Sequence, residues 1–193
     1  MRKPQHIVEI FLQPGDLYFG DRNTRIRTVL GSCVSLTFWH PELLVGGMCH
    51  YMLPNRSSEQ RKISALALDG RYADEAIEML IREINAIGAP HRDYKVKLFG
   101  GGNMFPDRSS PVSHVGIKNV ETARRLVTRH GFNCVAENLG GYGHRNVIFD
   151  VWNGDVWVKH AVIAHQQNRP HQLARQSIEN QIEDRRMPCA VFA

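Results

Sequence analysis

One cysteine and one histidine are the strongest candidates for chemistry in this sequence of 193 residues. Cys33 precedes an apolar run, Val34 to Trp39, and His50 lies in a second apolar run, Leu43 to Met52. The turn signal His40-Pro41-Glu42 separates the runs, so we expect them to pair as neighbouring strands. In a suitable register a thiol and an imidazole meet across the sheet, which is the arrangement that activates a cysteine nucleophile.

The residues just before the cysteine suggest a second chemical element. Gly31 and Ser32 end an alternating stretch, Arg25 to Leu30, directly before Cys33. A glycine here allows a tight backbone bend and a close approach by a substrate. Such a bend can direct successive backbone N–H groups at one point, so we expect the N–H groups around Ser32 and Cys33 to hold an oxyanion.

Other interpretations of these residues remain open. A cysteine in an apolar β-run is most often a small buried hydrophobe, and we keep this interpretation for Cys49, Cys134 and Cys189. Neighbouring strand residues face opposite ways, so only one of Cys49 and His50 can share the face of Cys33. A metal site made by Cys33, Cys49 and His50 is an alternative, although the sequence has no second cluster of ligands to support it.

Composition and charge are typical of one compact globular domain, with 42% hydrophobic and 22% charged residues. No apolar run is long enough to cross a bilayer, and the N-terminus lacks the apolar stretch of a secretory signal, so we expect a cytoplasmic protein. The four cysteines form no CxxC pair, which favours free thiols. The net charge of +5 suits an acidic protein surface as readily as nucleic acid, and no basic run with interleaved aromatic residues favours nucleic acid.

Apolar periodicity predicts the elements that position the two residues. We expect a first helix from Arg71 to Ile87, ended by Gly88, and a second helix capped by Asn119 and ended by Gly131. The Gly100-Gly101-Gly102 loop lacks the pattern of a phosphate-binding loop. Besides the two runs around the site, we expect strands over His6 to Leu12, Arg25 to Leu30, Lys95 to Phe99, Cys134 to Glu137, and a hairpin of Val147 to Trp152 with Val156 to Lys159.

Two polar segments are expected outside this framework. The segment from Asn55 to Lys62 has no apolar periodicity and predicts an exposed loop near the site. From His165 onward the sequence is polar and rich in glutamine. We therefore predict a domain over residues 1–163 and a C-terminal tail over residues 164–193, which is either a marginal surface helix or disordered.

Several motifs occur in an order that resembles a known family. They are Leu30-Gly31-Ser32-Cys33-Val34, Gly46-Gly47-Met48-Cys49-His50-Tyr51-Met52-Leu53-Pro54, Phe99-Gly100-Gly101-Gly102-Asn103-Met104-Phe105, Ile117-Lys118-Asn119-Val120, and Glu137-Asn138-Leu139-Gly140-Gly141 followed by Phe149. Together, over about residues 7 to 160, they resemble the CheD family of chemoreceptor glutamine deamidases. The joint order of several motifs is more specific than any single motif.

The resemblance implies an α+β fold, an α/β sandwich of mixed sheet with two main helices, similar to toxin-type cysteine glutamine deamidases. It implies an enzyme that hydrolyses glutamine side chains of chemoreceptors to glutamate through a cysteine thioester and releases ammonia, with no metal or other cofactor. Cys33 is the implied nucleophile and His50 the implied base. The implied partners are the cytoplasmic domains of chemoreceptors and the phosphatase CheC. Transfer to a lysine instead of water is an alternative outcome for the thioester.

One position departs from the family pattern. The third catalytic residue of the family is a threonine six places before the cysteine, where this sequence has Arg27, and Thr28 follows one place later. We predict a bulge between Thr28 and Gly31 that returns Thr28 to the site, because a guanidinium buried beside His50 without a carboxylate is costly. If Arg27 occupies the place instead, the alternative is a weakly catalytic or non-catalytic protein that binds receptors or CheC.

Overall fold

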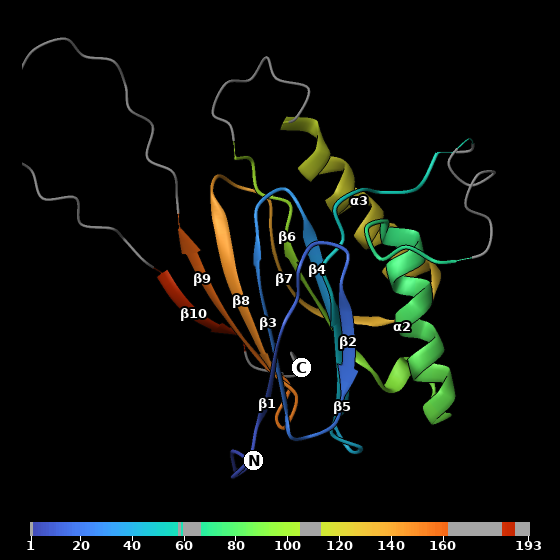
Figure 1. Ribbon diagram of the computed structural model, residues 1–193, viewed down its shortest axis with the longest axis vertical. Helices are drawn as coiled ribbons and strands as arrows, with labels where there is room; N and C mark the ends of the chain where they lie inside the picture. The colour runs from blue at the N-terminus through green and yellow to red at the C-terminus, as the bar shows by residue number, and fades with distance from the viewer. Residues whose placement is uncertain (1, 58, 60–66, 105–112, 162–182, 188–193) are drawn as a thin grey trace, which may run out of the picture.

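The computed structural model shows two five-stranded sheets packed face to face, with two helices against one of them (Figure 1). It describes residues 2–57, 59, 67–104, 113–161 and 183–187. We call the sheet that carries the helices the inner sheet and the other the outer sheet. The α+β class expected from the sequence is confirmed, and its strands divide between these two sheets.

The outer sheet has the strand order β1-β3-β8-β9-β10. Strand β1 pairs with β3 in parallel, and the other neighbours pair antiparallel. The strands are β1 (Val8–Phe11), β3 (Thr24–Leu30), β8 (His144–Asp150), β9 (Asp155–Ala161) and β10 (Glu183–Met187). The predicted hairpin around Asn153-Gly154 is therefore confirmed as β8 and β9.

The inner sheet has the order β2-β5-β4-β6-β7, and β6 and β7 are its one parallel pair among the described strands. The predicted antiparallel pairing of the two apolar runs is confirmed, with Phe38 opposite Gly47. The strands are β2 (Leu17–Gly20), β4 (Val34–His40), β5 (Val45–Cys49), β6 (Lys95–Gly100) and β7 (Asn133–Leu139).

Helices α2 (Ala73–Ile87) and α3 (Ser113–Arg129) cover the inner sheet on the side away from the outer sheet (Figure 1), and a short 3-10 helix, η1 (His91–Asp93), precedes β6. Gly88 ends α2 in the left-handed conformation, as predicted. The predicted start of the second helix is wrong, because α3 begins at Ser113 and Asn119 lies inside it. The side chain of Asn119 is fully buried and binds backbone carbonyls of other segments instead of capping a helix. Among the described residues, no helix is long and apolar enough to span a membrane.

Two apolar cores hold the three layers together. The core between the helices and the inner sheet includes Leu36, Phe38 and Leu80, and the core between the two sheets includes Ile26 and Phe149. Strand β4 is buried along its whole length because it lies between the two cores, and this burial includes the polar residues Ser35, Thr37 and His40.

The C-terminal part of the chain differs from expectation where it is described. Residues Glu183–Met187 form β10, which pairs antiparallel with β9, and are neither helical nor disordered. Main-chain pairing with an existing sheet edge needs little apolar periodicity, so these residues show no pattern typical of a strand. The rest of the predicted tail, and Cys189, lie outside the described residues, and the domain boundary at residue 163 stays a prediction.

The turn between β8 and β9 joins the two sheets through Trp39. The indole N–H of Trp39 donates to the carbonyl of Val151 over 2.7 Å, and Gly154 lies against the indole ring with a φ of 72°. A Cβ at Gly154 would overlap that ring. The glycine therefore allows both a left-handed turn and close packing between the sheets.

We expect Gly154→Ala to lower the free energy of unfolding in urea more than Gly88→Ala does. Both glycines have a left-handed φ, for which alanine costs roughly 1–2 kcal/mol. Only Gly154 also faces an obstacle, because a Cβ at Gly88 would meet no atom within 4 Å. Equal losses for the two variants would show that the Trp39 contact does not constrain the turn.

Candidate active site

Cys33 lies in the bend between β3 and β4, and the glycine loop after β6 supports its backbone. Gly102 N–H donates to the carbonyl of Gly31 and Gly101 N–H to that of Cys33, each over 2.8 Å. A Cβ at Gly100 would overlap the Cys33 carbonyl oxygen. The absence of side chains in this loop therefore lets its backbone approach the backbone of Cys33 closely. This role was not predicted from the sequence.

His50 follows β5, and the turn before β2 fixes its backbone. The N–H of His50 donates to the carbonyl of Asp16 over 2.9 Å, and the N–H of Gly15 donates to the carbonyl of His50 over 2.7 Å. The imidazole is buried with only 3% of the residue exposed. Both hydrogen bonds of the main chain are thus satisfied, and the ring is held in a defined place.

The register places Cys33 and His50 on one face of the inner sheet. Val34 and Tyr51 exchange two backbone hydrogen bonds, of 3.1 and 3.0 Å. Continuing that antiparallel register sets His50 opposite Ser35, two residues along from Cys33, so the thiol and imidazole are diagonal neighbours. Such neighbours have backbone positions roughly 7–8 Å apart, within reach of a histidine side chain.

Cys49 lies on the opposite face. Its side chain belongs to the core on the helix side, whereas Cys33 packs against the core between the sheets. The structure therefore does not bring together Cys33, Cys49 and His50, the set considered for a metal. Within the described parts of the chain, no group of three or more His, Cys, Asp or Glu residues is arranged to hold a metal ion.

Thr28 of the outer sheet reaches His50 across the gap between the sheets. Its Oγ1 lies 2.8 Å from His50 Nδ1, and the same hydroxyl donates to the carbonyl of Leu12 over 2.8 Å. A hydroxyl has one hydrogen, so a threonine that donates to Leu12 must accept from His50. Nδ1 therefore carries the proton, and Nε2 presents its lone pair. Among the described residues, this buried Nε2 has no hydrogen-bond partner.

The predicted bulge after Thr28 is wrong. Strand β3 pairs with β8 in regular register from Arg25 opposite Asp150 to Leu30 opposite Arg145. Thr28 faces His50 by simple alternation, since β3 belongs to the outer sheet and its buried face looks onto the inner sheet. Regular pairing was expected to put Arg27 at the site, because Arg27 stands six places before Cys33, where the family has its threonine; the regular strand instead directs Thr28 there.

Arg27 points to the other face of β3, away from the site. Its side chain is half exposed, lies 3.1 Å from a carboxylate oxygen of Glu9, and stacks over the ring of Phe11. The predicted outward orientation of Arg27 is therefore confirmed, although alternation and not a bulge causes it.

Burial keeps both members of the pair neutral at rest. Desolvation raises the pKa of Cys33 above its ordinary value of 9.0, and the cysteine's own backbone N–H opposes this. Desolvation also lowers the pKa of His50 below 6.5, opposed by the Leu12 carbonyl and the charge of Asp16. The sequence suggested a thiolate at neutral pH, but these directions indicate a thiol beside a neutral imidazole in the free protein.

The other described cysteines are free thiols with poor thiolate character, and the prediction of free thiols is confirmed for them. Complete burial raises the pKa of Cys49 to about 12. Desolvation and the neighbouring carboxylate of Glu137 raise the pKa of Cys134 to about 11.

Asn119 of α3 is a further polar residue at the site. Its Nδ2 donates to the carbonyls of Ser32 and Met52, over 3.0 and 2.8 Å. The sequence analysis noted Asn119 only as a helix cap and as part of a motif. A fully buried asparagine inside a helix is the signal that could have indicated a tertiary role, but burial is visible only in the structure.

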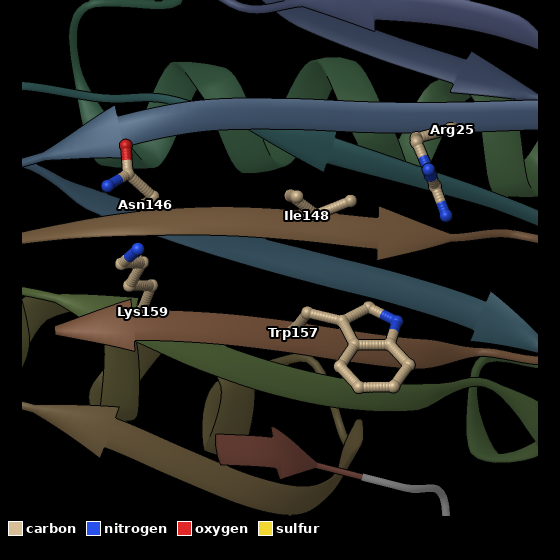
Figure 2. Close-up of a pocket in the computed structure, with 5 residues that line it drawn as sticks. All are labelled: Arg25, Asn146, Ile148, Trp157 and Lys159. Atoms are coloured by element: carbon tan, nitrogen blue, oxygen red, sulfur yellow. The ribbon is translucent and has the colours of Figure 1, made fainter. Parts of the chain in front are cut away.

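A pocket of about 330 Å³ lies elsewhere, on the exposed face of the outer sheet (Figure 2). Arg25, Asn146, Ile148, Trp157 and Lys159 line it. Arg25 is held by Asp150, with 2.6 Å between Nε and Oδ1. Since Thr28 occupies the buried face of the same sheet, this pocket is separate from the cysteine and histidine.

Comparisons with known proteins identify similar sequences. A family model described as CheD chemotactic sensory transduction matches residues 52–160. Proteins named probable chemoreceptor glutamine deamidase CheD are 49% identical over 162 residues in Pseudomonas fluorescens (83% of this chain, 89% of that protein) and 50% identical over 165 residues in Pseudomonas syringae pv. tomato (84% and 95%). One named CheD 1 from Chromobacterium violaceum is 46% identical over 167 residues (86% and 84%).

We expect alkylation of Cys33 by iodoacetamide to accelerate steadily as the pH rises through 9, because only the thiolate reacts and burial raises the pKa of its thiol. A preformed thiolate–imidazolium pair would instead react at a nearly constant rate from about pH 4 to 8. Peptide mapping after alkylation measures the rate at each cysteine, and Cys33→Ala gives the background. A flat profile through neutral pH would contradict the neutral resting pair.

Proposed function

This chain belongs to the CheD family, and we propose that it is a protein-glutamine glutaminase that hydrolyses specific glutamine side chains of chemoreceptors to glutamate. The observation that carries the proposed mechanism is the hydrogen-bonded series from the Leu12 carbonyl through Thr28 to His50, on the face of the sheet that holds Cys33. It supports a base with a defined tautomer beside a thiol. The receptor segments that react are those on the cytoplasmic side, where this protein acts.

In the first step Cys33 is the nucleophile. His50 Nε2 takes the proton from the thiol as the sulfur forms a bond to the side-chain carboxamide carbon of a receptor glutamine. The carbonyl oxygen gains the negative charge. Backbone N–H groups around Ser32 and Cys33 stabilise that oxyanion.

In the second step ammonia leaves. Protonated His50 gives its proton to the amide nitrogen, the carbon–nitrogen bond breaks, and a thioester with Cys33 remains. His50 then takes a proton from water, and the resulting hydroxide attacks the thioester. The carbon–sulfur bond breaks, protonated His50 returns its proton to the sulfur, and the new carboxylic acid of the receptor loses its proton to solvent. These steps use only groups of the chain, the glutamine and water.

Thr28 supports both protonation states of His50. In the neutral ring it holds the Nδ1–H tautomer that leaves Nε2 free. In the protonated ring, the Thr28 oxygen and the Leu12 carbonyl remain acceptors near Nδ1, and the charge of Asp16 favours the imidazolium. The low pKa of buried His50 makes its cation a strong acid, which suits donation to a poor leaving group.

The two alternatives to hydrolysis are a binding protein with lost or weak catalysis and transfer of the acyl group to a lysine. A binding protein with lost or weak catalysis was suggested by Arg27 at the third position, but Thr28 contacts His50 and Arg27 contacts Glu9. Transfer of the acyl group to a lysine in place of water differs in its requirement for an added amine. We propose water as the acceptor, and CheC as a partner that binds the enzyme.

Cys33→Ala is expected to abolish ammonia release from a receptor cytoplasmic fragment, and Cys49→Ala to leave it near the wild-type rate. His50→Gln should lower turnover by about 10²–10⁴-fold with little effect on receptor binding, since it removes general acid–base catalysis. Peptide mass spectrometry that maps glutamine-to-glutamate changes measures the product. Continued deamidation by folded Cys33→Ala would end the covalent mechanism, and release of ammonia only with an added amine would favour transfer.

Thr28→Val should lower the deamidation rate by about 10–100-fold, because a buried hydrogen bond worth roughly 1–3 kcal/mol no longer holds the His50 tautomer. Arg27→Thr is the matched control one residue away. Its rate should stay within about twofold of wild type, since an exposed ion pair is worth only ~0–1 kcal/mol. A faster Arg27→Thr enzyme would show that Arg27 impairs the site and would return support to the binding-protein alternative.

A further inference from the structure

We propose that Asn119 is a positioning residue that aims the backbone N–H of Cys33 at the oxyanion of the reacting carboxamide. The inference rests on the proposed function and adds to it a residue from a third element, α3. The side-chain hydrogen bonds of Asn119 go to the carbonyls of Ser32 and Met52, not to Cys33 or His50. It acts through the main chain on either side of them.

The carboxamide of Asn119 binds the two backbone segments that carry the reacting residues. Nδ2 has two hydrogens, and they go to the carbonyl of Ser32, one residue before Cys33, and to that of Met52, two residues after His50. The phenol of Tyr51 in turn donates to the main-chain carbonyl of Asn119 over 2.7 Å. The helix is therefore attached to both segments at the height of the site.

The Oδ1 atom of Asn119 indicates that packing alone does not explain why an asparagine stands at this position. Both neighbours are carbonyl oxygens, so the nitrogen must face them and the oxygen must face away. Within the described residues, this buried Oδ1 has no hydrogen-bond partner. A buried acceptor without a donor is unfavourable, and an apolar side chain would avoid that cost. The two donated hydrogen bonds are what the asparagine supplies.

Because the peptide group is planar, the hydrogen bond from Asn119 to the Ser32 carbonyl also sets the direction of the Cys33 N–H. The Ser32 carbonyl and the Cys33 N–H belong to one planar trans peptide group, in which they point in opposite directions. Since Asn119 holds that carbonyl toward α3, the Cys33 N–H points away from the helix. No backbone carbonyl in the described parts of the chain accepts from this N–H, and the same N–H lowers the pKa of the cysteine's own thiol.

The oxyanion forms beside the attacking sulfur, so the Cys33 N–H can donate to it. Such a donor works when it lies about 2.7–3.1 Å from the developing charge, so a rotated peptide group loses most of its effect. The ψ angle of Ser32 and the φ angle of Cys33 set the rotation of this peptide group, and both residues lie in the bend between β3 and β4, outside the strand ladders. The bond from Asn119 to the Ser32 carbonyl restricts that rotation.

The test compares deamidation with alkylation in Asn119→Ala. We expect kcat for a receptor cytoplasmic fragment to fall by about 10²-fold, with KM changed by less than about threefold. Alkylation of Cys33 by iodoacetamide forms no oxyanion, so its rate should stay within about threefold of wild type. Asn119→Ser retains one donor and should lose less activity than Asn119→Ala. It also provides the measurement if the alanine variant does not fold.

Tyr51→Phe is the matched control, because it removes a buried hydrogen bond between the same helix and the same segment without touching the Ser32 carbonyl. Its kcat should fall by less than that of Asn119→Ala, because the bond from Asn119 to the Ser32 carbonyl remains. The inference alone is overturned if wild type releases ammonia and the Asn119 variants keep a kcat within about threefold, or if alkylation and deamidation fall in equal proportion. A wild-type protein that releases no ammonia overturns the proposed function and the inference together.

Discussion

The hydroxyl of Thr28 links the two sheets through its hydrogen bond with His50. It spans the gap between a strand of the outer sheet and the end of a strand of the inner sheet, with Leu12 on one side and His50 on the other. A hydrogen bond tolerates only a few tenths of an ångström of change in length. The separation of the sheets, set by side chains such as Ile26 and Phe149, therefore also sets the geometry of the hydrogen bond between Thr28 and His50.

Local patterns were sufficient for the elements that the sequence predicted correctly. The alternation of Ile26, Thr28 and Leu30 marks the buried face of β3, and Gly88 marks the end of α2. The pairing of the two apolar runs that carry Cys33 and His50 was also predicted, because the turn signal between them is local. In each case the deciding interaction lies within a strand pair or a helix turn.

The partition of strands between sheets could not be predicted in this way. Nothing near Thr28 in the sequence states that β3 pairs with β8, more than 100 positions later, and not with the strand that follows it. The bulge was predicted without knowledge of this pairing, because Arg27 stands at the family's threonine position and a guanidinium buried beside His50 would be costly. The role of Asn119 is hidden for the same reason, since its two acceptors lie 87 and 67 positions away in the chain.

The same long-range pairing has a consequence during synthesis. Leu12, Thr28, Cys33 and His50 lie within the first 50 residues, but the strand that completes the pairing of β3 and the helix that holds Ser32 and Met52 leave the ribosome much later. Contacts this distant in sequence form slowly and only after the intervening chain exists. The contacts around Cys33 therefore form only when the protein is nearly complete.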